Sequence, residues 1–270
     1  MRSFALCLFA AVAAGKETQT HLRAEPATAV VETPKVATSF IRSLDFKQKL
    51  RVCNAYPPNT PLNIWVGKNQ VNDDPLPYKE CAEFDPKLTE GAKIDFKAMD
   101  TTVIGTFTVA SLPQNDATLL MVVYRHDAIS TAVSFESHVF ADSEQAQVTV
   151  IDTYRGHEEA NVKIMDKRDK KNTTEQIRYK SVVAVTPGVY EVELADAASG
   201  AIKAFDQLVA VPHESYVIVR CGIETQQQDG LNFPQEVFVY PHSDTHYFSA
   251  ASQWRPLSAM FALVTALFSL

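Results

Sequence analysis

The stretch Gly188-Val-Tyr-Glu-Val-Glu-Leu194 decides the fold class of this chain, because apolar and charged residues alternate along it. Its even positions, from Tyr190 to Leu194, are apolar and point to one face of an extended strand, whereas the two glutamates between them point to the other face. Such a strand has one face against a core and one face in water. A single sheet of this kind would leave its apolar face in water, so two sheets must stack face to face.

Similar short runs of β-branched and aromatic residues, separated by turn residues, continue on both sides of this stretch. No long segment has an apolar period of 3.6 residues, so we expect little helix. The expected strands are Leu50–Ala55, Leu62–Val66, Ala92–Ala98, Val103–Ala110, Leu119–Arg125, Val133–Phe140, Val148–Tyr154, Asn161–Met165, Ile177–Val185, Val189–Ala195, Phe205–Val211, Tyr216–Cys221 and Glu236–Tyr240.

These strands fall into two similar series. Leu50–Tyr56 (LRVCNAY) corresponds to Val148–Tyr154 (VTVIDTY), and Leu62–Val66 follows at the same spacing as Ala160–Ile164. Further matches in the same order are Tyr78-Lys79 with Tyr179-Lys180, Thr89–Gly91 with Thr186–Gly188, Leu120–Arg125 with Ser215–Arg220, and Val133–His138 with Glu236–Tyr240. About seven short strands in about 100 residues is typical of an immunoglobulin-sized domain. We therefore predict an all-β chain of two tandem antiparallel immunoglobulin-like β-sandwiches, at 42–142 and 143–243, that arose by internal duplication.

Both ends of the 270-residue chain carry targeting patterns. Residues 1–15 have a positive start at Arg2, an apolar run and small residues, which is typical of a signal peptide, and 16–41 read as a flexible leader. At the other end, 244–252 read as a stalk with anchor positions at Ser249 and Ala250, and 253–270 as a GPI-type signal. A tail anchor and a helix packed on the body are the alternatives. These patterns predict a secreted protein, or one held on the outer face of the plasma membrane by a C-terminal lipid anchor.

Composition limits the partners and indicates the compartment. The formal net charge of -7 argues against nucleic-acid binding, which needs a basic surface. Cys7 leaves with the signal peptide, and Cys53 and Cys81 lie in the same predicted domain, which favours a disulfide between them and leaves Cys221 as a buried thiol. Asn172 begins the sequon Asn-Thr-Thr and is the predicted glycosylation site.

Two segments resemble a known family. Leu50–Gly67 resembles the opening hairpin of the secreted domain-of-unknown-function 4397 family, although Asn54 and Asn59 stand where that family has histidine and aspartate. Val183–Gly200 is similar to that family's later strand and hairpin. The two-sandwich layout also resembles the AlgF-like adaptors of bacterial alginate O-acetylation. Both resemblances imply a β-sandwich that binds or scaffolds at a cell envelope, and neither implies catalytic residues.

No motif for catalysis emerges from the sequence. There is no G-x-S-x-G, and no glycine-rich phosphate loop among only nine glycines. The histidines at 126, 138, 157 and 213 have no partner motif, and His157-Glu-Glu lacks the second histidine of a zincin. We therefore predict no cofactor and no enzymatic activity.

Three other segments have a functional and a structural interpretation. His242-Ser-Asp-Thr-His246 has metal-ligand spacing, but its place before the anchor favours a polar spacer. The basic run Lys167–Lys171 offers charges to anionic sugars or lipids, but a solvated hairpin tip is the favoured interpretation. Trp65 offers a ring to a sugar, or else packs on the second face of a sheet.

The sequence as a whole predicts a non-catalytic surface protein that binds an envelope protein or a glycan. The alternatives are an adaptor in extracellular polysaccharide modification and a hydrolase with an unrecognised site.

Overall fold

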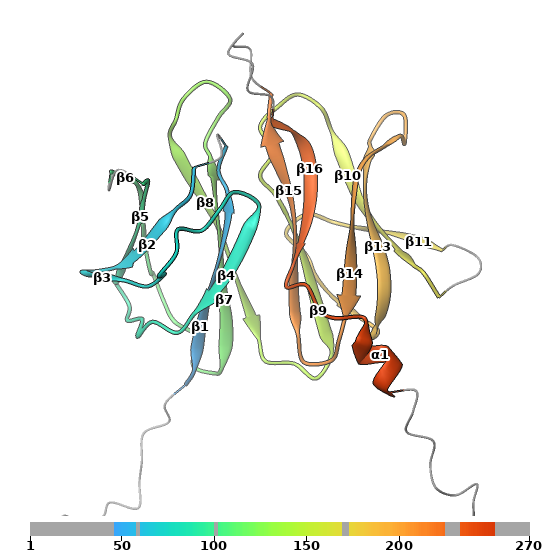
Figure 1. The fold of residues 1–270 in the computed structure, drawn as a ribbon, viewed down its shortest axis with the longest axis horizontal. Coiled ribbons are helices and arrows are strands. Elements are labelled where there is room, and N and C mark those ends of the chain that lie inside the picture. The colour runs from blue at the N-terminus through green and yellow to red at the C-terminus, as the bar shows by residue number, and fades with distance from the viewer. Residues whose placement is uncertain (1–45, 58–59, 100–101, 169–172, 225–232, 252–270) are drawn as a thin grey trace, which may run out of the picture. The chain divides into compact units, whose positions relative to one another are not determined.

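The computed structural model describes residues 46–57, 60–99, 102–168, 173–224 and 233–251, and these form two series of strands and a short helix (Figure 1). The first series is β1 (Gln48–Ala55), β2 (Asn63–Val66), β3 (Asn69–Gln70), β4 (Glu80–Phe84), β5 (Lys93–Lys97), β6 (Val103–Thr108), β7 (Ala117–Arg125) and β8 (Val133–Ala141). The second is β9 (Ala146–Asp152), β10 (Ala160–Asp166), β11 (Thr174–Ile177), β12 (Val182–Val185), β13 (Gly188–Asp196), β14 (Ile202–Ala210), β15 (Ser215–Ile223) and β16 (Phe233–Tyr240). Helix α1 (His246–Ala251) lies in the predicted stalk, and within the described ranges no helix has the length and apolarity to cross a bilayer.

The two series have the same topology. The first forms sheets of order β4-β1-β7-β8 and β3-β2-β5-β6, and the second forms β12-β9-β15-β16 and β11-β10-β13-β14. Adding eight to each strand number converts one pair of sheets into the other. The prediction of an all-β chain built as two tandem sandwiches is confirmed.

Small irregularities recur at matched positions. The β5–β6 ladder has a bulge between Phe96 and Lys97, and the β13–β14 ladder has one between Leu194 and Ala195, ninety-eight residues later in each case. Lys79 and Lys180, both after a tyrosine, have left-handed backbones with φ of 64° and 61°. Bulges and left-handed non-glycine residues are uncommon, so their repetition supports duplication more strongly than the shared strand order does.

A side-chain pair recurs as well. The amide nitrogen of Gln70 donates to Asn63 Oδ1 at 3.2 Å, and that of Gln176 donates to Asn161 Oδ1 at 2.9 Å. Asn63 and Asn161 occupy matched positions, so a substitution of one can serve as the control for the same substitution of the other.

One pair in each sandwich departs from the expected antiparallel order. β1 pairs with β7 in parallel, and β9 pairs with β15 in parallel. Both β7 and β15 follow a strand of the opposite sheet, so no hairpin forces them to run against β1 or β9. Each sandwich also has eight strands rather than about seven, in an order that differs from the immunoglobulin constant domain.

The alternation at 188–194 has the predicted effect. Tyr190, Val192 and Leu194 are buried in the core of the second sandwich, whereas Glu191 and Glu193 remain half-exposed. The first sandwich has a separate core that includes Ile64, Phe96 and Val123.

A third apolar cluster joins the two sandwiches. Leu120 and Val122 of β7 belong to it together with Val217 and Val219 of β15, and all four are buried. The sheets that contain β7 and β15 therefore have both faces covered, which explains why these strands are unbroken apolar runs. Both sandwiches, over the described residues between 46 and 251, belong to one compact unit.

Two ion pairs across this junction are reciprocal. Lys79, in the turn before β4, pairs with Glu236 of β16, and Lys180, in the turn before β12, pairs with Glu136 of β8 at 2.9 Å. The matched lysine of each copy thus contacts the last strand of the other copy. This is the contact pattern of an isologous dimer, here within one chain.

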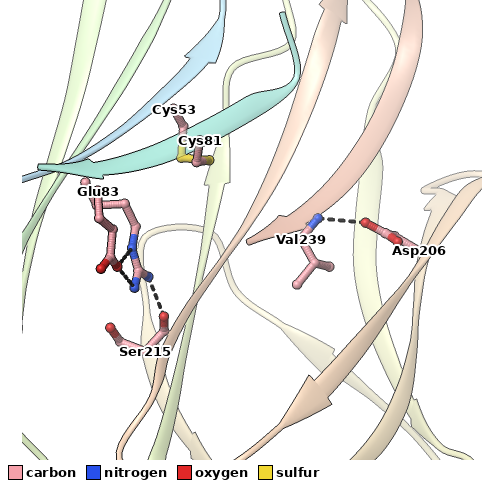
Figure 2. Close-up of a disulfide and its surroundings, with 7 residues drawn as sticks. Cys53, Cys81, Glu83, Asp206, Ser215 and Val239 are labelled. Atoms are coloured by element: carbon pink, nitrogen blue, oxygen red, sulfur yellow. Dashed lines mark hydrogen bonds and ion pairs between the residues drawn. A yellow bond between two sulfur atoms is a disulfide. The ribbon is translucent and has the colours of Figure 1, made fainter. Parts of the chain in front are cut away.

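Arg51 also connects the two sandwiches. Its side chain is 1% exposed, its Nε donates to Glu83 Oε1 at 2.9 Å, and its Nη1 donates to the backbone oxygen of Ser215 in the other sandwich (Figure 2). Its Nη2 lies 3.1 Å from Glu214 Oε1, and its guanidinium lies 5.2 Å from the ring centroid of Tyr240. Arg51 is thus bonded to both sandwiches.

Candidate functional site

The candidate site lies where β9 and β15 of the second sandwich end. Arg220 of β15 is directly opposite Asp152 of β9, and Arg220 Nη1 lies 2.9 Å from Asp152 Oδ2. The other terminal nitrogen of Arg220 donates to the backbone oxygen of Glu158 at 2.6 Å and to Gln235 Oε1 at 2.8 Å. The guanidinium also lies 4.6 Å from the ring centroid of Tyr154. The arginine is therefore fixed on several sides while only 4% exposed.

One donor of this arginine is not used. Arg220 Nε is buried and has no hydrogen-bond partner, a state that the described part of the chain shows elsewhere only at Trp65 Nε1. An unpartnered buried donor is costly and rare in native proteins, so it requires an explanation.

A cavity of about 400 Å³ is lined by Arg220. Tyr154, Tyr179 and Asn161 line it too, as do the exposed His157 and Glu159. The cavity thus brings aromatic rings, an amide and charged groups together in one place.

The lack of a side chain at Gly156 leaves room for the Tyr154 ring. A Cβ built at Gly156 would lie 2.2 Å from the Tyr154 hydroxyl oxygen, so any side chain there would displace the ring or the loop. Burial raises the pKa of Tyr154, and the carboxylates of Glu224 and Glu158 add to that rise. Tyr154 is therefore a neutral phenol at physiological pH.

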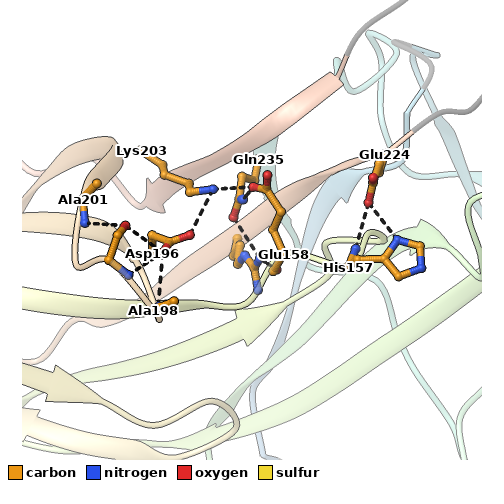
Figure 3. Close-up of polar contacts among 10 residues, drawn as sticks. His157, Glu158, Asp196, Ala198, Ala201, Lys203, Glu224 and Gln235 are labelled. Carbon is orange, nitrogen blue, oxygen red and sulfur yellow. Dashed lines mark hydrogen bonds and ion pairs between the residues drawn. The ribbon is translucent and has the colours of Figure 1, made fainter.

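Carboxylates beside the cavity contact neighbouring polar groups (Figure 3). Lys203 pairs with Glu158 and lies 3.2 Å from Asp196 Oδ2, while Glu224 accepts the backbone N–H of His157 at 2.8 Å. Hydrogen bonds from Lys203 and its charge lower the pKa of Glu158, and the backbone N–H and hydroxyl of Ser199 lower that of Asp196. These groups are ionised at neutral pH.

The first sandwich has uncharged residues at the position of the Asp152–Arg220 pair. Asn54 and Asp152 are matched residues, and each accepts the backbone N–H of the tyrosine two residues later at 3.0 Å. Asn54 is directly opposite Val123, where Asp152 is opposite Arg220. The match of Leu120–Arg125 with Ser215–Arg220 was therefore wrong by two residues, because the strand registers make Val123, and not Arg125, the counterpart of Arg220. The amide of Asn54 donates to two backbone oxygens, and Val123 is fully buried. The first copy therefore closes its core without any ion pair at this point.

The predicted site residues have separate locations. Cys53 and Cys81 face each other across β1 and β4 and form a disulfide with Cα atoms 4.0 Å apart (Figure 2). Cys221 is a buried free thiol whose pKa burial raises to about 12, which makes it unreactive. Asn172 lies outside the described residues, and Ser249 and Ala250 fall in α1.

The four histidines do not gather. His126 Nδ1 lies 2.9 Å from the Ser134 hydroxyl, and the half-buried His138 packs edge-on against the Phe140 ring. His213 has a left-handed backbone, with φ of 64°, beside the junction of the sandwiches. Only His157 contributes to the candidate site.

The remaining candidates have structural roles in the described residues. The ring of Trp65 is on the outer face of its sheet with the Lys97 ammonium 3.8 Å from its centroid. Lys167 pairs with Glu191 at 2.5 Å and Arg168 with Asp166 at 2.9 Å, while 169–172 lie outside the described part. No group of three or more His, Cys, Asp or Glu side chains within the described ranges, including the segment His242–His246, is arranged to hold a metal ion.

The sequence interpretation missed Asp152, Arg220, Tyr154 and Tyr179. A signal was present, because an aspartate and an arginine terminate two strands that are otherwise apolar. Their pairing follows only from the parallel β9–β15 register.

Comparisons with known proteins add little to this geometry. No family model and no curated protein matches the chain, so the resemblances drawn from its segments stay predictions. Among solved structures, the chain is similar to a family 26 carbohydrate-binding module of Eubacterium rectale Amy13K in complex with maltoheptaose, at 6% identity over 74% of this chain and 99% of that one, with a TM-score of 0.23. It is also similar to the Bacillus anthracis TIE protein, at 12% identity over 68% of this chain and 34% of that one, with a TM-score of 0.20. Likenesses at such TM-scores carry no argument about a ligand. The class of this protein therefore comes from its own topology, which is that of an all-β protein of two tandem sandwiches.

Proposed function

We propose that this protein is a non-catalytic binding protein that acts outside the cell, and that the cavity at the end of its second sandwich receives the ligand. The observation that carries the proposal is the contrast between the Asp152–Arg220 pair and its counterpart in the first copy, Asn54 and Val123. The fold does not need a charged pair at this point, since one copy closes without it.

The energetics favour a functional origin for the pair. A buried ion pair repays its desolvation cost only with good geometry and full hydrogen bonding. Here one donor, Arg220 Nε, stays unpaired. The second copy therefore keeps a pair that the fold neither requires nor fully compensates, which is expected where the pair serves a ligand in the adjoining cavity.

The disulfide between Cys53 and Cys81 supports an oxidising compartment for this protein, since such bonds are rare in the cytosol. We accordingly place the protein at the outer cell surface, anchored through lipid attached near Ser249 or Ala250, with an envelope protein or a glycan as its partner.

The anchor is tested on intact cells. Phosphatidylinositol-specific phospholipase is expected to release the protein into the medium, because it cleaves the lipid from a GPI anchor. The released fraction is measured by immunoblot, with a transmembrane surface protein as the retained control. A protein that stays in the cytosolic fraction contradicts the proposed location.

The binding site is tested with a matched pair of variants. Asn161→Ala removes an amide from the cavity wall, and Asn63→Ala removes the matched amide of the first copy, which lines no part of this cavity. Both variants lose the same glutamine contact, so their stabilities change alike. We expect Asn161→Ala alone to weaken binding of labelled protein to cell-wall material about two- to tenfold, the effect of one hydrogen bond.

Flow cytometry of labelled cells, or a pull-down with insoluble wall material, measures this difference. Equal binding by the two variants at matched folded concentration would remove the cavity from the binding surface and, with it, the proposed function.

A further inference from the structure

The first sandwich contains an apolar cavity of about 220 Å³ that is lined by residues of both its sheets. Four of the lining residues belong to the core and are at most 3% exposed: Leu50, Ile94, Leu120 and Met121. Four others are exposed to solvent: Ala110, Ser111, Ser137 and Val139. The cavity therefore leads from the surface into the core, so a small molecule can enter it.

One face of β8 changes from buried to exposed along the strand. Phe135 packs into the core, where its ring centroid lies 5.2 Å from that of Phe96. Ser137 and Val139 point to the same face, because side chains alternate along a strand. Both are nevertheless exposed, Val139 by 48%. The sandwich is therefore open at this end of β8.

The second sandwich has a tyrosine at the matched place. By strand register, Leu119 of β7 corresponds to Tyr216 of β15, because they are opposite the matched residues Leu50 and Val148. Tyr216 is fully buried in the second core, and its hydroxyl oxygen accepts the backbone N–H of Val211 at 3.0 Å. Leu119 is smaller and lines the cavity. The first copy thus lacks a ring that helps to fill the core of the second.

A hydrogen bond that closes the second sandwich has no counterpart in the first. The registers match Ser137 of β8 with Val239 of β16, and Phe107 of β6 with Asp206 of β14. Asp206 Oδ2 accepts the backbone N–H of Val239 at 2.7 Å and connects β14 to β16 (Figure 2). Val239 is only 1% exposed. The Phe107 side chain has no acceptor, so it cannot connect β6 to β8 in this way.

The lining residues determine which ligands fit. None of the described residues that line the cavity is an acid, a lysine or an arginine. Burial lowers the pKa of His138, the one titratable residue among them, so it is uncharged at physiological pH. A charged group would lose its hydration there without gaining a partner. Because an apolar cavity of about 150 Å³ holds benzene, a volume of about 220 Å³ accommodates about nine carbon atoms.

We propose that this cavity is a second binding site, and that it takes an uncharged aliphatic chain of about nine carbon atoms. The chain contacts the core residues, and the polar end of the molecule stays at the opening beside Ser111 and Ser137. The site belongs to the first copy alone, because Tyr216 and the bond from Val239 to Asp206 close the second. It is independent of the polar cavity at the end of the second sandwich.

The test is isothermal titration calorimetry of the full-length protein with the straight-chain primary alcohols from 1-butanol to 1-dodecanol. We expect one molecule to bind per chain, and each methylene that enters the cavity to tighten binding about fourfold. The gain is expected to end at about nine carbon atoms, where the cavity is full. A fourfold gain that continues through 1-dodecanol overturns the enclosed site.

Two variants reduce the cavity in different ways. Leu119→Tyr installs the residue of the second copy, and Ser137→Leu adds an apolar side chain at the opening. Each is expected to weaken binding of 1-octanol about four- to fifteenfold, the effect of one or two methylenes that no longer fit. Thr108→Leu is the control, since Thr108 is an exposed residue of β6 that does not line the cavity, and it leaves the affinity unchanged.

Circular dichroism checks that each variant keeps the wild-type fold. Ser137→Leu decides the result if Leu119→Tyr does not fold, because Ser137 is exposed. No saturable heat with any of the alcohols, or equal affinity of the wild type and Ser137→Leu, overturns the proposal. Asn161→Ala is expected to bind 1-octanol like the wild type, so the alcohols and the cell-wall assay report on separate sites.

Discussion

Replacement of Arg51 by methionine is expected to lower the free energy of unfolding by about 3–5 kcal/mol, the range found when one partner of a buried ion pair is removed. Arg51 is almost fully buried and is bonded to Glu83 in its own sandwich and to the backbone of Ser215 in the other. Methionine fills much of the volume but leaves a buried carbonyl oxygen unpaired. Chemical denaturation followed by tryptophan fluorescence and circular dichroism measures the loss.

The same variant tests whether the two sandwiches unfold together. Because Arg51 bridges them, its loss is expected to separate one cooperative transition into two, seen as different midpoints for the two signals. Lys49→Met is the control, since the half-exposed Lys49 reaches the same Glu83 at 3.4 Å and is expected to change stability by less than about 1 kcal/mol. A loss below 1 kcal/mol in Arg51→Met would contradict the bridging role.

The pH dependence of the free energy of unfolding provides a second test of the Arg51–Glu83 contact. Burial raises the pKa of Glu83, but the hydrogen bonds and charge of Arg51 outweigh it and lower the pKa overall. A lowered carboxyl pKa stabilises the fold above its unfolded value of about 4.3, and this stabilisation is lost as the pH falls through the folded value. The wild-type protein is therefore expected to lose stability below about pH 4.5 more steeply than Arg51→Met does.

The sequence was sufficient for features that depend on local pattern. Alternation from Gly188 to Leu194 fixes which side chains face the core, because the two-residue period of a strand leaves no other arrangement. The recurrence of Tyr-Lys before β4 and β12 carries over to the backbone, since both lysines are left-handed. The duplication was readable because matched residues keep the same local conformation.

Features that depend on register between distant strands were not predictable in the same way. The unbroken apolar run of β7 fits a strand buried on both faces, yet nothing in it names β15 as the surface that covers it. Arg51 and Ser215 are 164 residues apart, and Asp152 and Arg220 are 68 apart. Parallel pairing brings the second pair together, and the sequence had favoured antiparallel sheets.

The duplication also makes the strongest test of the binding site possible, because the first copy provides a ready replacement for the Asp152–Arg220 pair. Arg220→Val alone is expected to cost about 3–5 kcal/mol, since it leaves Asp152 without its partner at a partly buried position. The double variant Asp152→Asn with Arg220→Val installs the residues of the first copy. Its stability is expected to return to within about 1 kcal/mol of the wild type, since hydrophobic replacement of a whole buried pair is often neutral.

Binding is expected to follow a different course from stability in this cycle. The double variant regains the fold but lacks the guanidinium and one carboxylate of the cavity wall, so its affinity for the ligand is expected to stay below one tenth of the wild-type value. Thermal denaturation and the assay of binding to cell-wall material, on the same samples, measure the two quantities. A double variant as unstable as Arg220→Val would show that the second copy needs the pair to fold, and a double variant that binds normally would show that the ligand lies elsewhere. Only restored stability without binding fits a pair that the second sandwich keeps for its ligand, because the first sandwich already shows that the fold is complete without it.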